Sequence, residues 1–492
     1  MNSKKALLVY ISQIIMQLVG VANVYVITRC ITPEDLGLLN YYIYVMSIFL
    51  FFSSIQYSGL MFKKMAADDE LKQDFFSVFL SLKLCSGIIA ILGMTGYIFY
   101  FNNSADMKVL LVGIITINEL LKKVIYESLI AVFQAKNQVK KTQTILFIQS
   151  ILGFILILFV LTYVQRIEVL ALIYLIQTIL GIFITGIFLN KSDIKGQIYI
   201  NKKVIKQYWL YTKPLILASV FALLFTNFGP ILIEKFSGKE ELGLFVIAKK
   251  FNLIILTISS SIININFSNL SKFASKNKKK MMNQYTRKVT RYVSLITVPL
   301  VGLIIIFVNE ITSILIGSTF SESAELTLYF MIPVLLVTYS RTSGSVLRSI
   351  ENTVAISKIV IFSRIVGLLL FFIFLPKEFI GVTMLGLGAK GLIFVHIITG
   401  IMTISLSIYY NYKYAQVVFY YRVFIHIITA MIIGYVVFQI KYLIGNIYLS
   451  LSLFSFIYLF LYVAVLFIVK ELKKSDIIYI KDLLKPNQII SY

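Results

Sequence analysis

Fourteen long runs of mostly apolar residues constrain the fold of this chain more than any other feature of its sequence. Each run is long enough to cross a bilayer, because a transmembrane helix needs roughly 20 apolar residues. Hydrophobic residues make up 59% of the 492-residue chain and charged residues only 14%, whereas soluble domains are about 45–50% apolar and about 25% charged. We therefore predict an all-α, polytopic membrane protein with about 14 transmembrane helices. The predicted spans are residues 6–28, 38–60, 75–100, 109–133, 142–164, 168–190, 208–233, 242–268, 292–316, 326–349, 354–375, 389–411, 417–438 and 446–469.

The connections between these spans are too short to hold an extramembrane domain. The longest polar stretches are residues 190–207 and 270–291, together with the tail after Val469. The first run is too long for the core of a cleaved signal peptide and has no small-residue cleavage site, so we expect it to be retained as the first helix.

The distribution of positive charge predicts the orientation of the chain. Lys and Arg number 46 against 22 Asp and Glu, a net charge of +24. With the N-terminus in the cytoplasm, about 29 of the cations fall on the cytoplasmic side and about 7 on the outer side, which follows the positive-inside rule. Both termini are therefore predicted to be cytoplasmic. We interpret the basic run Lys272–Lys280 as a cytoplasmic loop on anionic lipid, which removes nucleic acid as a partner.

Ten cations remain inside the predicted spans, where an ionised side chain costs at least about 2.5–3.5 kcal/mol. Snorkelling to a helix end accounts for Lys213, Arg348 and Lys390, and Lys83, Lys249 and Lys250 are intermediate cases. The cations nearest to mid-span are Lys122, Lys123, Arg341 and Arg364. The acidic residues in the spans are Glu119 and Glu127, with Glu168 and Glu310 near outer helix ends.

The fourth span carries the most informative charges. Glu119, Lys123 and Glu127 are spaced i, i+4, i+8, so an α-helix would stack them on one face beside Lys122. One interpretation is a self-neutralising buried cluster that fixes helix packing. The other, which we favour, is a hydrated face that lines a pathway and whose carboxylates carry protons or bind a cation.

Cysteine and histidine are too few for several classes of chemistry. Cys30 and Cys85 are the only cysteines, and His396 and His426 the only histidines. This excludes a disulfide framework or thiolate metal cluster and makes metal or His-based nucleophilic catalysis unexpected. We predict no catalytic residue, no metal site, no cofactor and no enzyme activity.

A repeated block indicates an internal duplication. Pro33–Leu38 reads Pro-Glu-Asp-Leu-Gly-Leu and Lys239–Leu244 reads Lys-Glu-Glu-Leu-Gly-Leu, 206 residues apart. A weaker echo pairs residues 134–137 with residues 349–352. Both pairs are six helices apart, which predicts two parallel six-helix repeats around a central cavity plus two extra C-terminal helices. The acidic pair would cap the following helix, and the Gly would allow a tight turn or a close helix approach. The corresponding domains are 1–207, 208–412, 413–469 and the tail 470–492.

A series of short motifs runs through about residues 1–410. They are Arg29–Asn40, Tyr211–Leu217, Gly238–Lys249, Pro299–Leu300, Leu315–Gly317, Leu375–Pro376 and Gly386–Gly391. In their order and spacing they resemble the polysaccharide-export branch of the multidrug/oligosaccharidyl-lipid/polysaccharide (MOP) flippase superfamily, and most of all its O-antigen flippases. The chain departs from the family at Asn227, where an acidic residue is common, and at Asn264–Phe267, where a Pro is frequent.

The resemblance implies a flippase of the bacterial cytoplasmic (inner) membrane that moves an undecaprenyl-pyrophosphate-linked oligosaccharide to the outer leaflet, as in O-antigen and lipopolysaccharide biosynthesis. Two alternatives stay open, namely a cation-coupled multidrug antiporter of the same superfamily and a membrane polymerase or glycosyltransferase of the same pathway. Expected partners are the lipid-linked glycan, membrane lipids and the glycan polymerase machinery. The residues expected to bind the cargo are Lys122, Lys123, Lys249, Lys250, Arg341 and Arg364. Glu119 and Glu127 are the candidates for coupling to H⁺ or Na⁺.

Overall fold

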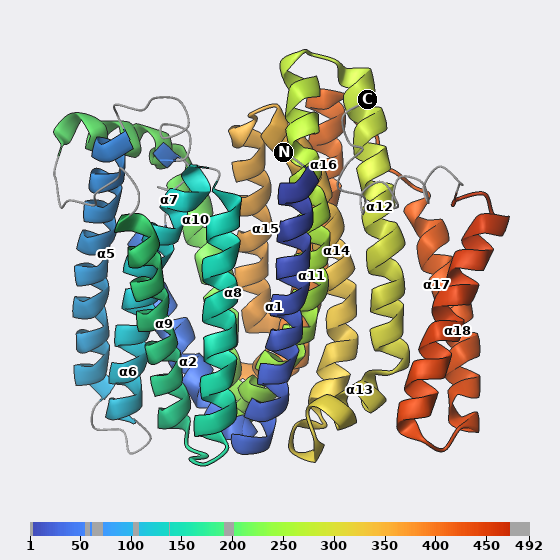
Figure 1. Cartoon of the computed structure of the whole chain (residues 1–492), viewed down its shortest axis with the longest axis horizontal. Coiled ribbons are helices and arrows are strands. Elements are labelled where there is room, and N and C mark those ends of the chain that lie inside the picture. The colour runs from blue at the N-terminus through green and yellow to red at the C-terminus, as the bar shows by residue number, and fades with distance from the viewer. Residues whose placement is uncertain are drawn as a thin grey trace. The chain divides into compact units, whose positions relative to one another are not determined.

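The computed structural model describes residues 3–54, 60–61, 72–101, 108–136, 138–190 and 201–472, and these fold into a succession of long helices (Figure 1). A hairpin of two-residue strands, β1 (Glu378–Phe379) and β2 (Val382–Thr383), pairs antiparallel between α15 and α16. The helices are α1 (Ser3–Cys30), α2 (Pro33–Phe49), α3 (Phe51–Ser54), α5 (Lys72–Phe101), α6 (Val109–Leu120), the π-helix η1 (Leu121–Tyr126), α7 (Glu127–Ala135), α8 (Val139–Leu156), the π-helix η2 (Ile157–Leu161), α9 (Ile167–Asn190), α10 (Lys202–Ser237), α11 (Lys239–Ser275), α12 (Lys279–Ile306), α13 (Val308–Leu315), the 3₁₀-helix η3 (Ser318–Phe320), α14 (Ser323–Ser349), α15 (Thr353–Phe374), α16 (Gly388–Ala415), α17 (Val423–Ile440), the 3₁₀-helix η4 (Lys441–Leu443) and α18 (Ile447–Ile468).

The all-α, polytopic fold is confirmed. Within the described residues, 12 helices are long and apolar enough to cross a membrane, so the predicted number of 14 is not confirmed. The difference lies in the second and fourth predicted spans. The second begins as α2, which has only 17 residues and is followed by α3, and the fourth is divided into α6, η1 and α7.

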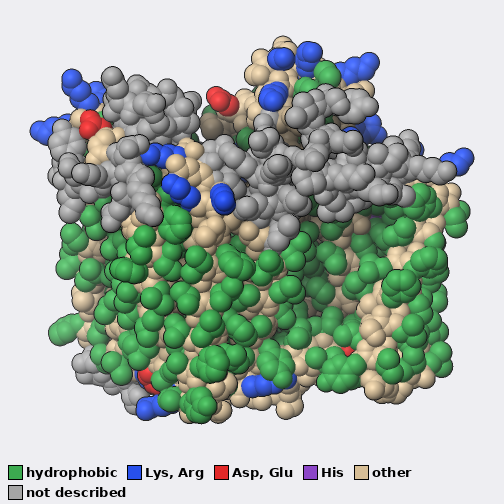
Figure 2. Space-filling model, in the orientation of Figure 1, with side chains coloured by type: hydrophobic (Ala, Val, Ile, Leu, Met, Phe, Trp, Pro, Cys, Tyr) green, Lys and Arg blue, Asp and Glu red, His purple; other side chains and the backbone are tan. Residues whose placement is uncertain are grey.

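The polar stretch 270–291, predicted as a connection between two spans, is mostly helical, and of the predicted loop Lys272–Lys280 only the turn between Ser275 and Lys279 is not helical. Helix α11 continues to Ser275 and α12 begins at Lys279. Lys, Arg, Met and Gln are good helix formers and the stretch has no Gly or Pro, so both helices extend past their apolar parts. On the face shown in Figure 2, hydrophobic side chains cover the middle of the helices, and Lys and Arg side chains gather near helix ends, among them the α11–α12 turn.

Contacts divide the chain into two compact units. Unit 1 comprises Met1–Gln13, Leu244–Ile359 and Ile393–Tyr492, and unit 2 comprises Ile14–Gly243 and Val360–Leu392. The predicted lobes 1–207 and 208–412, with helices over 413–469, describe an internal symmetry and stay a prediction. Most of the predicted tail 470–492 lies outside the described residues.

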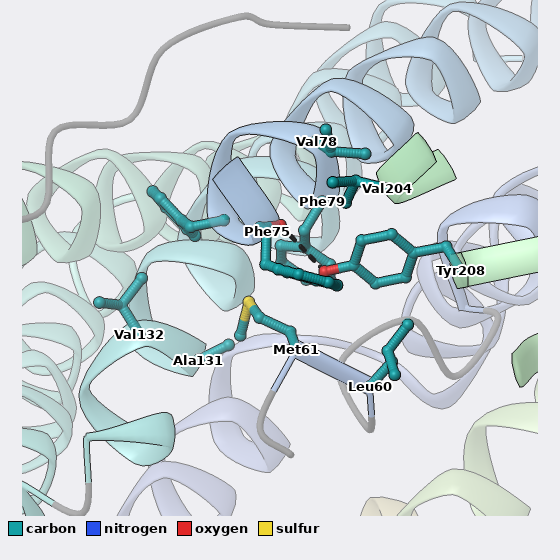
Figure 3. Close-up of a cluster of buried hydrophobic side chains, with 10 residues drawn as sticks. Leu60, Met61, Phe75, Val78, Phe79, Ala131, Val132, Val204 and Tyr208 are labelled. Carbon is teal, nitrogen blue, oxygen red and sulfur yellow. Dashed lines mark hydrogen bonds between the residues drawn. The ribbon is translucent and has the colours of Figure 1, made fainter. Parts of the chain in front are cut away.

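An aromatic cluster holds α10 against α5 and α7 in unit 2 (Figure 3). Phe75 and Phe79 of α5 and Tyr208 of α10 are almost completely buried and pack with Met61. The Tyr208 hydroxyl donates a hydrogen bond of 2.9 Å to the backbone carbonyl of Phe75. A buried hydroxyl needs such a partner, so this bond fixes the start of α10 against α5.

The last two helices, α17 and α18, pack on α12 in unit 1. Their contact is apolar and includes Phe307, Val437, Tyr458 and Leu466, all nearly fully buried. The predicted pair of extra C-terminal helices is therefore a firmly packed part of unit 1.

The two copies of the repeated block contact each other reciprocally. A Cβ added at Gly37 would collide with the carbonyl of Lys239, and one added at Gly243 would collide with the carbonyl of Pro33. Pro33 and Lys239, like Gly37 and Gly243, are equivalent positions of the repeat. The first turns of α2 and α11 therefore cross with pseudo-two-fold symmetry, and both glycines serve the close helix approach that the sequence predicted.

Ion pairs in unit 2 link three connections between predicted spans. The sequence predicts that all three connections lie on the same side of the membrane. The Lys108 ammonium lies 3.1 Å from Asp35 and 4.0 Å from Glu168. These residues follow the first, third and fifth predicted spans. Their meeting at one end of the helices supports the predicted alternation of the spans across the membrane.

Candidate substrate site

The six cations predicted to bind cargo belong to both units. Lys122, Lys123 and Arg364 lie in unit 2, and Lys249, Lys250 and Arg341 lie in unit 1. The surroundings of the three cations in each unit are therefore described separately.

A π-helix changes the predicted arrangement of the fourth span. Between Glu119 and Glu127 the chain forms η1, which interrupts the α-helical spacing of i, i+4, i+8 and breaks up the expected stack. The ammonium of Lys122 lies 3.6 Å from the Glu119 carboxylate, and that of Lys123 lies 2.8 Å from Glu127. The structure thus contains two separate pairs, and π-helical turns of this kind occur frequently at functional sites.

Neighbouring polar side chains hold the Glu119 carboxylate of the Glu119–Lys122 pair in place. The Glu119 side chain is only 3% exposed and accepts a hydrogen bond of 3.3 Å from the Asn118 amide. Asn118 in turn accepts one of 2.8 Å from the Thr178 hydroxyl of α9. This chain of bonds orients a buried carboxylate, as the packing interpretation of the cluster requires for Glu119.

The other charges of this span are accessible. Side-chain exposure is 46% for Lys122, 35% for Lys123 and 44% for Glu127, although all three lie in the predicted span 109–133. Charges at membrane depth face the bundle interior or a water-filled cavity, because contact with lipid is too costly. The exposure of Lys122, Lys123 and Glu127 agrees with the predicted hydrated face, which stays a prediction.

Lys83 of α5 is a further cation of this site that sequence reasoning left as intermediate. It is 8% exposed, its ammonium donates to the backbone carbonyl of Ser53, and it lies 3.3 Å from the Ser53 hydroxyl. Its helix α5 contacts η1, which carries Lys122 and Lys123. The sequence leaves Lys83 between snorkelling and a mid-span charge, and no signal in the sequence revealed its buried partner.

Arg364 of α15 lies half-buried in unit 2. Its guanidinium stands 4.3 Å from the centre of the Phe225 ring of α10. A cation over an aromatic face is stabilised without a neutralising carboxylate, so Arg364 keeps its positive charge available to an anion.

In unit 1, Arg341 connects α14 to α11. Its guanidinium donates to the Ser260 hydroxyl and lies 3.4 Å from the Leu256 carbonyl. Lys249 and Lys250 lie two to three turns earlier on α11 and are half-buried. Neutral hydroxyl and carbonyl groups orient Arg341, and among the described residues it forms no ion pair with a carboxylate.

The family position at Asn227 carries no charge in this chain. Asn227 is 9% exposed, and its amide donates a 2.9 Å hydrogen bond to the Leu223 carbonyl of its own helix. The residue behaves as a satisfied polar side chain of α10.

A second ionic cluster, which the sequence did not reveal, lies in unit 1. The Glu471 carboxylate is buried and lies 3.3 Å from Arg291 of α12 and 3.2 Å from Arg422. The Tyr420 hydroxyl donates to it, and burial together with this hydrogen bond raises the pKa of Tyr420. The cluster ties the chain after α18 to α12, which is a structural role.

Comparison with known proteins identifies relatives over most of the chain. The model of a family described as "Polysaccharide biosynthesis protein" matches residues 26–325. The capsular polysaccharide biosynthesis protein CapF of Staphylococcus aureus is 23% identical over 300 residues, which cover 61% of this chain and 73% of CapF.

Solved structures share the fold. The lipid II flippase MurJ in an inward closed conformation superposes with a TM-score of 0.71 at 15% identity, covering 93% of this chain and 98% of MurJ. An inward-facing multidrug resistance transporter of the MATE family, in the MOP superfamily, gives a TM-score of 0.63 at 14% identity, covering 83% of this chain and 97% of the transporter. At these identities the likeness concerns the fold alone.

Proposed function

Because the chain belongs to the polysaccharide biosynthesis protein family, we propose that it is a flippase that moves an undecaprenyl-pyrophosphate-linked oligosaccharide from the cytoplasmic to the outer leaflet. Membership, together with the MurJ-like and MATE-like fold, confirms the resemblance seen in the sequence motifs. The proposal adds the cargo and its direction to what the family establishes.

The observation that carries the proposal is an excess of cations over carboxylate partners, within the part of the chain that the structure describes, in the predicted spans. Each of the four acidic residues in the predicted spans is paired with a cation, namely Glu119 with Lys122, Glu127 with Lys123, Glu168 with Lys108 and Glu310 with Lys441. Arg341 and Arg364 instead contact hydroxyl, carbonyl and aromatic groups. The spare charge is therefore positive, which suits an anionic cargo.

A pyrophosphate needs such groups to cross a region of low dielectric. Charge-assisted hydrogen bonds from Lys or Arg to phosphate oxygens are among the strongest in proteins, and attraction between opposite charges grows as the dielectric falls. Lys122, Lys123 and Arg364 of unit 2 and Lys249, Lys250 and Arg341 of unit 1 would receive the pyrophosphate or its sugars in turn. The polyprenyl tail would stay in the bilayer while the two halves alternate in access.

The two alternatives fit the charges less well. A cation-coupled drug antiporter, whose substrates are usually cationic, would favour unpaired carboxylates in the cavity. A polymerase or glycosyltransferase would need carboxylates or Arg on a sizeable loop, whereas the outer connection between α15 and α16 is folded into the short β1–β2 hairpin. We therefore assign transport and no enzymatic step.

Ion coupling is assigned to Glu119 or Glu127. Protonation of either carboxylate would release its lysine, Lys122 or Lys123, to bind cargo, which links H⁺ to transport. Na⁺ would act in the same way by competing for the carboxylate. The proposal also places the chain in the bacterial inner membrane with both termini in the cytoplasm, next to the glycan polymerase machinery.

The test is complementation of a strain that lacks its own flippase for the same glycan. Six variants replace Lys122, Lys123, Lys249, Lys250, Arg341 or Arg364 by Ala, and surface glycan is measured at equal protein level. Loss of a charge-assisted hydrogen bond costs about 1.5–3 kcal/mol, so we expect export to fall roughly ten-fold or more for the residues that hold the pyrophosphate.

The matched control is Arg166→Ala, because Arg166 is a cation at a helix end with 73% of its side chain exposed. Export by this control should stay normal. Full export by all six Ala variants would refute the assigned cargo site.

A further inference from the structure

A cavity of about 1010 Å³ in unit 1 lies outside the cation sets described above. Its walls are the α11–α12 turn, the α14–α15 turn and the end of α16. Its charged lining residues are Lys278, Lys279, Arg348 and Glu351, and several hydroxyl and amide side chains, such as Asn277 and Asn352, lie beside them. The polar rim and the volume suit a small polar headgroup.

The positive charges of this cavity are uncompensated. Lys278, Lys279 and Arg348 form no ion pair with a carboxylate in the described part of the chain, and Glu351, the sole acidic residue of the lining, is exposed. The guanidinium of Arg348 instead stands 5.8 Å from the centre of the Phe267 ring, which orients it and leaves its donors available. Three cations around one cavity with a single exposed carboxylate favour an anionic occupant.

The cavity lies where three helices that are long and apolar enough to cross a membrane begin or end. The α14–α15 turn separates two of them, which end at Ser349 and begin at Thr353, and Ala415 ends the third. The ends of such helices are where lipid headgroups are expected. Apolar side chains continue the wall toward the membrane, among them Val354, which is 64% exposed, and Tyr414, which is 41% exposed. A polar, cationic cavity bordered by exposed apolar side chains at a helix end has the chemistry of an interface site.

We propose that this cavity binds the anionic phosphate headgroup of a membrane lipid with net negative charge. Lys278, Lys279 and Arg348 hold the phosphate, and the lipid chains leave along Val354 and Tyr414. The site is distinct from the predicted cargo cations, and the proposal does not depend on the proposed transport function. It also makes part of the basic run Lys272–Lys280 a defined site instead of a diffusely attracted loop.

The experiment measures lysine acetylation by mass spectrometry on the full chain in nanodiscs. Discs contain phosphatidylcholine alone, phosphatidylcholine with phosphatidylglycerol, or phosphatidylcholine with undecaprenyl pyrophosphate. A fourth sample adds inorganic phosphate to the first kind of disc. The internal control is Lys280, a neighbour on the same turn that does not line the cavity.

We expect either anionic lipid to slow acetylation of Lys278 and Lys279 about five-fold relative to phosphatidylcholine alone, whose phosphate is neutralised by its own choline, with Lys280 little changed. The two lipid samples separate a bulk phospholipid from the pyrophosphate lipid as the source of the headgroup. Arg348→Gln should restore acetylation of both lysines, because it removes one holder of the phosphate without touching them. The matched variant Lys280→Gln should not.

Three results would overturn the proposal. Equal protection of Lys278, Lys279 and Lys280 would show diffuse attraction to the surface. Protection by inorganic phosphate that equals protection by the lipids would show a site for free anions. Acetylation that no lipid changes would show that the cavity takes no headgroup.

Discussion

At the scale of single residues, two glycines carry the clearest link between sequence and structure. Gly37 and Gly243 occupy the same position of the repeated block, and each faces the carbonyl of the other block's first residue. The sequence predicted a turn or a close approach at this block, and the structure shows the approach. The sequence could not predict that the two blocks contact each other, because a repeat in the sequence gives no information on where its two copies lie in space.

We expect Gly37→Ala to destabilise the protein by about 1–3 kcal/mol, the usual cost of overpacking, because the new Cβ collides with a backbone carbonyl that no side-chain rotation can move. The measurement is thermal unfolding in detergent, followed by loss of monodisperse protein.

Gly96→Ala is the matched control, since Gly96 is also helical and a Cβ there meets no atom within 4 Å. This change should leave stability equal or slightly higher, because Ala favours the helix. Equal melting of both variants would contradict the close crossing of α2 and α11.

At the scale of elements, hydropathy located the helices well. It did not reveal the π-helix in the fourth span or the polar extensions of α11 and α12. The π-helix η1 contains no Pro or Gly to mark it, so the spacing of Glu119, Lys123 and Glu127 predicts an α-helix there. Hydropathy places the polar stretch 270–291 between two spans but does not reveal that it is mostly helical, because hydropathy reports lipid contact and not helix formation. Partners such as Ser53 for Lys83 depend on tertiary packing and leave no pattern in the sequence.

Removing the buried ion pair between Lys441 and Glu310 tests how α17 is held against α13. Lys441, at the end of α17, is 1% exposed and lies 2.7 Å from Glu310 of α13 and 2.7 Å from the Ile306 carbonyl. Lys441→Met should destabilise the fold by about 3–5 kcal/mol, because it leaves the Glu310 carboxylate without its cation. Thermal unfolding of the purified protein measures the loss.

The double variant Lys441→Met/Glu310→Gln removes both charges and should recover much of that stability. If the single variant melts like the unmodified protein, the pair does not hold α17 in place.

At the scale of the whole molecule, the predicted orientation makes a direct prediction. Single cysteines replace Arg166, Lys377 or Lys280, all of them exposed, in a background with Cys30 and Cys85 changed to Ser. A membrane-impermeant thiol reagent added to intact cells should label positions 166 and 377, on predicted outer connections, and spare position 280. Labelling of position 280 alone would show the opposite orientation. It would contradict the prediction, which follows from the excess of Lys and Arg on the connections assigned to the cytoplasm.

The central claim, passage of a lipid-linked glycan across the membrane, is tested most directly by transport in vesicles. Purified protein is reconstituted with undecaprenyl-pyrophosphate-linked oligosaccharide, and an impermeant glycosidase outside measures how much glycan reaches the outer leaflet with time. We expect the protected half of the glycan to become accessible with the unmodified protein, and to stay protected with a variant that lacks the cations Lys122, Lys123, Arg341 and Arg364. Accessibility that rises no faster than in protein-free vesicles, or equally fast with the variant, would contradict the account.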